Sequence, residues 1–221
     1  MLTSFILVIS AYFVGGIPSG YLLVKYTKNV SPLKLGYGSA GASNISEISG
    51  YTSGLIVGTF DCLIKGTLPI IICRILEQPS YLQAIVAILC VIGHNWSPYL
   101  KAKGGRGVAT SIGILIAFQM WWSLLIFTIL IGLIGRIIFK DTAFWVLVSF
   151  ITLPLTAQYF APQISLTYPC AVLLLVLILK RITGNWENPR LHNKIHATLL
   201  NRFLFDRDIR SRRDWKLKIS L

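Results

Sequence analysis

Charged residues are scarce in this sequence, and acidic residues are the scarcest. Only 13% of the 221 residues are charged, whereas soluble domains usually carry about 25%. Hydrophobic residues make up 54% of the chain. A single water-soluble core cannot bury that much apolar sequence, so the composition excludes an ordinary soluble domain. It predicts an all-α, polytopic membrane protein.

The sequence also lacks the patterns of common metal, disulfide and nucleotide sites. Its four cysteines show neither metal-ligand spacing nor a disulfide framework. They all lie in or at the ends of apolar segments, as Cys62, Cys73, Cys90 and Cys170. The glycine-rich loops differ from the P-loop pattern, so ATP is not inferred. We therefore expect neither a metal ion nor a cofactor.

The excess of positive charge is large. Lys and Arg number 21 against 8 Asp and Glu, which gives a net charge of +13. Nucleic-acid-binding proteins can show such a balance, but no basic groove motif accompanies it here. The cations lie mostly between apolar segments and after the last one, as in the cytoplasmic loops of membrane proteins. We expect anionic lipid headgroups as partners and no nucleic acid.

Apolar segments divide the chain into about seven predicted transmembrane helices. They span, approximately, residues 2–24, 52–74, 81–93, 107–120, 122–138, 142–160 and 165–180. The segments 81–93 and 107–120 are shorter than the ~20 residues that cross a bilayer squarely. Short helices at membrane depth are tolerated where they line a polar cavity, so we expect a polar site between these two. Pro18 and the glycines around it should break the first segment.

Loop charge predicts the orientation of the chain. Lysines and arginines occupy alternate loops, near residues 25–34, 101–106 and 136–140, and the tail. The positive-inside rule places the N-terminus outside and the C-terminus in the cytoplasm. We predict a transmembrane domain over 1–182 and a basic cytoplasmic tail over 183–221, mostly solvated and partly disordered. The oligomeric state is not predicted.

Three polar clusters fall on the predicted inner side, and the first is GYGSAGASN at 36–44. Its glycines can expose successive backbone N–H groups, which bind anions as a nest. An ordinary flexible connector has a similar composition. The functional and the structural interpretation of this loop therefore both stay open.

The second cluster lies inside an apolar segment. Asp61 and Lys65 are four residues apart, so they share one helix face and can pair. Ionisable residues inside a membrane helix usually mark a functional interior. The pattern is compatible with a purely structural ion pair and with an Asp61 that orients Lys65 toward a ligand.

The third cluster, GHNWSPYLKAKGGRGVAT, runs from 93 to 110. Lys103 and Arg106 supply charge, and the glycines supply backbone donors. Thr110 opens the next helix, whose positive end attracts anions. Phosphate is the ligand that this combination favours, and an amphiphile with a phosphate headgroup would fit beside short helices. His94 is a candidate general base, with a structural histidine as the alternative.

Together these stretches resemble a known family, the bacterial membrane acyl-phosphate:glycerol-3-phosphate acyltransferases, or PlsY family. The resemblance covers about residues 12–195, and its most specific part is the run at 93–110. IPSGYLL at 17–23, GYGSAGASN at 36–44 and FDCLIKG at 60–66 accompany it. The resemblance implies seven transmembrane helices. It also implies transfer of an acyl chain from acyl phosphate to the 1-hydroxyl of glycerol 3-phosphate, giving lysophosphatidic acid and phosphate for phospholipid biosynthesis.

The clusters and the resemblance define the predicted site. The predicted catalytic residues are Ser43, Asn44, His94 and Lys103. Substrate phosphates are expected to contact Gly36, Gly38, Ser39, Gly41, Lys65, Gly104, Gly105, Arg106, Gly107, Thr110 and Asn185. Because the donor is already activated, the enzyme need only align hydroxyl and carbonyl, neutralise phosphate charge and exclude water.

The chain departs from the family pattern where the acceptor is expected to bind. Tyr37 stands where the family usually has serine, and Glu47 where it has arginine. The third motif, RITGN at 181–185, lacks the histidine and one arginine of the family. Two alternatives therefore stay open: an acyl-phosphate-dependent transferase with another acceptor, and a non-catalytic lipid-phosphate-binding protein. A transporter ranks last, because the sequence shows no repeated halves.

Overall fold

The protein is almost entirely helical. A computed structural model describes residues 1–161, 164–186, 195–211 and 214–215, and no β-strand forms over these residues. The α-helices are α1 (Leu2–Gly16), α2 (Ser19–Lys28), α3 (Ala42–Ser49), α4 (Tyr51–Phe60), α5 (Leu68–Ile75), α6 (Ser80–Asn95), α7 (Val108–Ala117), α8 (Trp121–Thr128), α9 (Thr142–Phe160), α10 (Ile164–Thr183) and α11 (Ile195–Phe205). The prediction of an all-α protein is confirmed.

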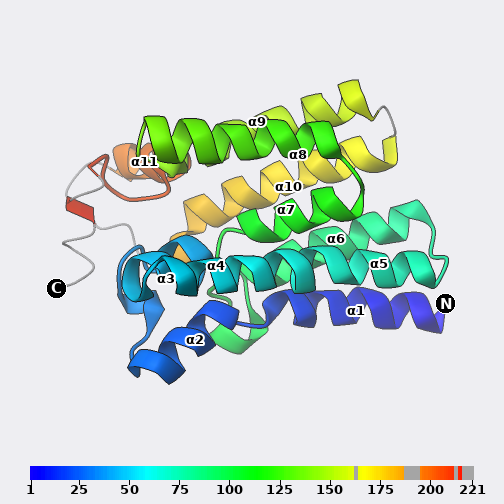
Figure 1. Cartoon of the computed structure of the whole chain (residues 1–221), viewed down its shortest axis with the longest axis horizontal. Helices are drawn as coiled ribbons and strands as arrows, with labels where there is room; N and C mark the ends of the chain where they lie inside the picture. The colour runs from blue at the N-terminus through cyan, green and yellow to red at the C-terminus, as the bar shows by residue number, and fades with distance from the viewer. Residues whose placement is uncertain (162–163, 187–194, 212–213, 216–221) are drawn as a thin grey trace.

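The apolar helices lie side by side in a bundle (Figure 1). Within the described residues, 5 helical stretches are long and apolar enough to cross a membrane: Leu2–Lys28, Tyr51–Ile75, Trp121–Ile138, Thr142–Phe160 and Leu166–Thr183. The shorter apolar helices are α6 and α7. Each predicted segment is therefore helical, and the two that flank the second glycine-rich loop are short, as the sequence predicts.

Figure 1 shows α2, α3 and α11 gathered at one end of the bundle, opposite the N-terminus. The glycine-rich loop at 36–41 leads into α3, and the loop at 101–107 leads into α7. Both loops thus belong to the end of the bundle that also carries the described part of the tail.

The first apolar segment is broken, as Pro18 predicts. Helix α1 ends at Gly16, and α2 begins at Ser19, directly after Pro18. Proline has no backbone N–H to continue a helix. Ser97 Oγ donates a hydrogen bond of 2.6 Å to the carbonyl of Gly16. This bond links the C-terminal end of α1 to the loop that follows α6.

Glycines bring α1 and α6 into close contact. A Cβ at Gly15 would overlap the backbone carbonyl of Cys90, and a Cβ at Gly93 would overlap that of Tyr12. Small residues at such positions let membrane helices approach closely. The contact fixes α6, which carries His94 near its end.

Two segments are π-helical, η2 (Asp61–Thr67) and η4 (Ile129–Ile138). Apolar periodicity does not distinguish a π-turn from an α-turn, so the sequence predicted ordinary helices there. π-Helical turns occur frequently at functional sites. Both segments contribute residues to the cavity described below.

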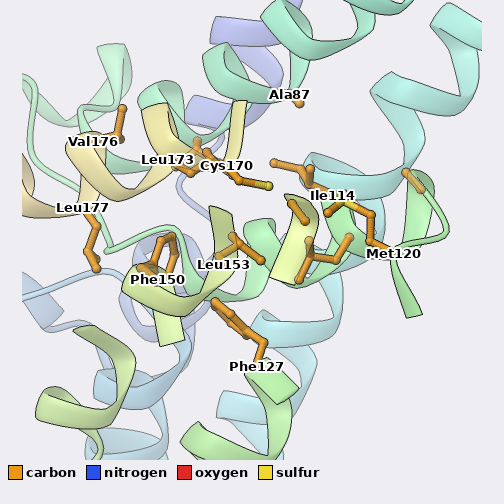
Figure 2. Close-up of a cluster of buried hydrophobic side chains, with 14 of the residues drawn as sticks. Ala87, Ile114, Met120, Phe127, Phe150, Leu153, Cys170, Leu173, Val176 and Leu177 are labelled. Carbon is orange, nitrogen blue, oxygen red and sulfur yellow. The ribbon is translucent and has the colours of Figure 1, made fainter. Parts of the chain in front are cut away.

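The largest apolar core lies between α6, α7, α8, α9 and α10. Figure 2 shows Phe127, Phe150 and Leu153 meeting side chains of α7 and α10. The rings of Phe127 and Phe150 pack edge to face with centroids 5.1 Å apart, an arrangement that adds to the stability of buried area. This core holds α7 in place, and α7 begins at the second glycine-rich loop.

The described part of the tail is folded, so the prediction of a mostly solvated tail is wrong for these residues. Helix α11 packs against α9 and α10, and Thr198 and Trp215 are buried. Arg202 forms a buried ion pair with Asp208, with an N–O distance of 2.5 Å. The sequence suggested exposed charges because it does not show which cations have an internal partner. The other tail residues, 187–194, 212–213 and 216–221, lie outside the described part.

Candidate active site

A cavity of about 310 Å³ opens among the two glycine-rich loops, the two π-helical segments and the tail. Its polar wall includes Tyr37, Ser39, Ser43, Asn44, Asp61, His94, Arg106, Arg136, Asp141, Arg181, Asp206 and Arg207. Its apolar wall includes Ile112, Ile131, Val146, Phe205 and Trp215. The cavity therefore offers both cations and hydrocarbon side chains to a ligand.

Asn44 organises the first glycine-rich loop. Its Nδ2 lies 2.9 Å from the carbonyl of Pro32, 3.1 Å from that of Leu35 and 2.7 Å from that of Ser39. Its Oδ1 accepts a hydrogen bond of 2.6 Å from the N–H of Tyr37. The side chain is fully engaged by the loop backbone, which favours a positioning role for Asn44 over the predicted catalytic one.

Asn44→Ala is expected to release the loop around Ser39 and Ser43. Three carbonyls and one N–H would lose their partner, and a loop displaced by about 1 Å can cost about a hundredfold in rate. We expect kcat to fall by about tenfold or more while the protein still folds. Product formation, measured beside thermal unfolding, checks this. Full activity would show that the loop holds its shape without Asn44.

The second glycine-rich loop packs directly on the end of α6. The N–H of Gly105 donates to the carbonyl of His94 at 3.1 Å, and a Cβ at Gly105 would overlap His94 Nε2. A Cβ at Gly104 would lie 2.7 Å from the carbonyl oxygen of Asn95. Gly107, with φ of 73°, caps α7 in the left-handed region that favours glycine. Each glycine here is required by a contact or by its backbone conformation.

Asn185 joins the two loops to each other. Its Nδ2 donates to the carbonyl of Gly38 at 3.0 Å, and its Oδ1 accepts from the N–H of Gly104 at 3.1 Å. The Oδ1 also accepts from Lys180 Nζ at 2.7 Å. Lys180 is fully buried and in addition donates to the carbonyl of Asn95. Lys180 was not among the predicted site residues, although a lysine at the end of an apolar segment is itself a signal of a functional interior.

The predicted pair of Asp61 and Lys65 is confirmed. Lys65 Nζ lies 2.6 Å from Asp61 Oδ1, and both side chains are buried. Ser19 Oγ donates to the same oxygen at 2.7 Å. His94 Nδ1 lies 3.7 Å from the other oxygen of Asp61. The carboxylate thus stands between a lysine and the candidate base.

Four arginines reach the cavity, and two of them are paired with carboxylates. Arg106 Nε lies 2.7 Å from Asp206 Oδ1, and Arg207 Nη2 lies 2.6 Å from Asp141 Oδ2. Arg136 is exposed and stacks over the ring of Tyr51 at 5.6 Å. The fourth arginine is Arg181. Only Arg106 was among the predicted site residues, because Arg136 and Arg181 lie in the last turns of apolar helices and Arg207 lies in the tail.

The predicted site residues divide into those that line the cavity and those that support its walls. Ser39, Gly41, Ser43, Asn44, His94, Arg106 and Gly107 line it. The others, Gly36, Gly38, Lys65, Lys103, Gly104, Gly105, Thr110 and Asn185, do not line it. Thr110 Oγ1 is buried without a hydrogen-bond partner. Lys103 contributes its backbone, since its carbonyl accepts from the N–H of Ser97 at 3.1 Å.

Tyr37 and Glu47, the two departures from the family pattern in the first motif, differ in position. Tyr37 lines the cavity, whereas Glu47 is exposed on α3 and does not line it. A substrate inside the cavity would therefore meet the tyrosine and not the glutamate.

No group of three His, Cys, Asp or Glu residues in the described part of the chain lies close enough together to hold a metal ion.

Comparison with known proteins agrees with the fold and with the motifs. The family described as glycerol-3-phosphate acyltransferase matches residues 5–190. Glycerol-3-phosphate acyltransferase 5 of Dehalococcoides mccartyi is 32% identical over 219 residues, which cover 95% of this chain and 91% of that protein. The glycerol-3-phosphate acyltransferase of Coxiella burnetii is 30% identical over 82% of this chain and 90% of that protein.

A solved structure is similar over most of the chain. It is PlsY, an integral membrane glycerol 3-phosphate acyltransferase in its glycerol 3-phosphate form, with a TM-score of 0.72 and 26% identity. The similarity covers 81% of this chain and 88% of PlsY. With its apolar helices and this likeness, the protein is a membrane protein. The chain belongs to the glycerol-3-phosphate acyltransferase family.

Proposed function

We propose that the protein transfers an acyl chain from an acyl phosphate to the 1-hydroxyl of glycerol 3-phosphate, releasing lysophosphatidic acid and inorganic phosphate. The observation that carries this proposal is one cavity that is lined both by arginines and by apolar side chains. Arginines are well suited to bind phosphate oxygens. Apolar walls suit the hydrocarbon chain of the donor. Family membership supports the reaction class.

The residues around the cavity fit a direct transfer. The 1-hydroxyl oxygen attacks the acyl carbonyl carbon, the bond between that carbon and the phosphate oxygen breaks, and phosphate leaves with the electron pair. No nucleophile on the protein is needed, because the donor is already activated. The arginines and the backbone N–H groups of the loops neutralise phosphate charge. The hydroxyl proton goes to His94, which lines the cavity and whose Nδ1 lies 3.7 Å from Asp61 Oδ2.

We assign the cavity to the cytoplasmic side of a bacterial inner membrane. The end of the bundle that carries it also carries α2, which contains Lys25 and Lys28, and the described part of the basic tail. By the positive-inside rule this end faces the cytoplasm, which leaves the N-terminus outside. Anionic lipid headgroups are then the expected neighbours of the exposed cations at this end.

Phosphate release by the purified protein tests the proposal. The protein receives palmitoyl phosphate with and without glycerol 3-phosphate, and lysophosphatidic acid is measured beside phosphate. We expect release that depends on the acceptor and an equal amount of lysophosphatidic acid. Release that ignores the acceptor would mean hydrolysis, and no release from folded protein would leave a lipid-phosphate-binding role.

Tyr37 gives a second candidate function some support, because it lines the cavity where the family usually has a serine. This candidate keeps acyl phosphate as donor and uses a different acceptor. Acceptor competition separates the two functions. If no other polar alcohol outcompetes glycerol 3-phosphate, the second candidate is excluded.

Arg106→Gln is expected to raise the KM for a phosphate-bearing substrate by about tenfold or more, the scale of one lost charge-assisted contact. Lys103→Gln should have a smaller effect, because Arg106 lines the cavity and Lys103 does not. Both substitutions remove one positive charge from the same loop, so their comparison separates direct contact from net charge. KM and kcat measured for each substrate check the prediction, and a larger effect at Lys103 would contradict it.

A further inference from the structure

The tail places the carboxylate of Asp206 against Arg106, an arginine of the cavity wall that is suited to bind phosphate. Asp206 directly follows α11, and Arg106 Nε lies 2.7 Å from both of its carboxylate oxygens. The Arg106 side chain is 17% exposed and the Asp206 side chain 20% exposed. Both residues line the cavity. A small molecule in the cavity can therefore reach this pair, unlike the buried pair of Arg202 and Asp208.

Local structure does not favour an aspartate at this position. Asp206 has a φ of 55°, in the left-handed region where glycine or asparagine is usual after a helix. Its N–H bonds to the carbonyl of Arg202 at 2.9 Å, so it stands at the C-terminal end of α11. A negative charge there is repelled by the partial negative charge of the helix end. The contact with Arg106 offsets this repulsion, because it places a positive charge 2.7 Å from the carboxylate.

The tail does not depend on Asp206 for its attachment. Arg202 and Asp208 pair inside the tail, and Arg202 Nη1 donates to the carbonyl of Ile182 at 3.1 Å. Arg181 Nη1 donates to the carbonyl of Phe203 at 2.8 Å. These contacts hold α11 against α10. The carboxylate of Asp206 is thus available for a role other than anchoring the tail.

Arg106 keeps a free donor while it is paired. Its Nη1 is buried and has no hydrogen-bond partner. A phosphate monoester shares a charge of about −2 among three terminal oxygens, whereas a carboxylate shares a charge of −1 between two, so phosphate is the stronger partner of the guanidinium. A neutral group or a monoanionic carboxylate offers no such advantage over Asp206.

We propose that Asp206 is a specificity-determining residue, which occupies Arg106 until the phosphate group of a substrate displaces it. Neutral and monoanionic carboxylate molecules fail this competition, and phosphate monoesters succeed. The phosphate belongs either to the acceptor or to the acyl-phosphate donor, and kinetics with each substrate distinguishes them. This inference rests on the proposed function for its identification of the substrates.

The test is Asp206→Asn, which preserves shape and suits the left-handed backbone. We expect the KM of one of the two substrates to fall about fivefold, and the inhibition constant of inorganic phosphate to fall with it. Glycerate, a carboxylate analogue of the acceptor, should become a better inhibitor. A merely loosened tail would change these constants in the opposite direction, because it would weaken the cavity wall.

The matched control is Asp214→Asn. Asp214 is exposed and does not line the cavity, and its substitution changes the net charge by the same amount. Equal phosphate affinity in the two variants would overturn the proposal. In an Arg106→Gln background, Asp206→Asn should no longer change phosphate affinity, and a persistent change would also overturn it.

Calorimetric binding of inorganic phosphate to the folded protein in detergent separates this inference from the proposed function. If the wild-type protein forms no lysophosphatidic acid, the proposed function fails, and phosphate binding to the Asp206→Asn and Asp214→Asn variants still decides the role of Asp206. If the wild-type protein is active and phosphate binds both variants alike, the role of Asp206 fails and the function stands.

Discussion

Gly104→Ala is expected to lower kcat/KM by about a hundredfold or more. The new methyl group would overlap the carbonyl oxygen of His94 and lie 2.7 Å from that of Asn95. Both obstacles are backbone atoms at the end of a packed helix, so the loop must move instead. The N–H of Gly104 would then leave Asn185, and the register between the two glycine-rich loops would be lost. Product formation at saturating and limiting substrate measures the effect.

Gly58→Ala provides the matched control. Gly58 lies in α4, and the nearest atom to an added Cβ is the Cβ of Ala42 at 3.4 Å, an ordinary contact. Alanine also favours the helix there. This variant should keep wild-type turnover. Wild-type turnover in Gly104→Ala as well would mean that the second loop takes no part in catalysis.

Lys65→Met is expected to reduce the free energy of unfolding by about 3–5 kcal/mol. It leaves the carboxylate of Asp61 buried beside Ser19 without its ammonium partner. Methionine fills nearly the same space, so the loss reflects the unpaired charge rather than a cavity. Unfolding in mixed micelles with a denaturing detergent gives the measurement.

The second substitution Asp61→Asn, added to Lys65→Met, should restore at least half of the lost stability, because it removes the isolated charge. Lys25→Met on the exposed surface of α2 should change stability by about 0.5 kcal/mol or less. A Lys65→Met variant as stable as the wild type would show that Asp61 finds another partner or takes up a proton.

Local sequence patterns predicted the helices and the main polar pair. The apolar runs, the break at Pro18 and the four-residue spacing of Asp61 and Lys65 depend on residues close together in the chain. Such patterns determine local structure directly. The short helices around the second glycine-rich loop also pointed to the region in which the cavity lies, because short helices at membrane depth are tolerated beside a polar cavity.

Long-range contacts could not be predicted in this way. Arg207 and Asp206 reach the cavity from a tail that the sequence presents only as basic. Asn44 and Asn185 were selected as site residues, yet most of their hydrogen bonds run to loop backbone. The partner of an amide or a guanidinium is set by the tertiary fold, and a single sequence carries no signal of it.

The bridge made by Asn185 also has a consequence for biosynthesis. The two loops that it joins are translated early, and the amide that holds them together stands at position 185 of 221. A nascent chain therefore inserts its first helices before the two loops can be joined. The loops are joined only after α10 has left the ribosome and entered the membrane, so a protein truncated before Asn185 cannot form this bridge.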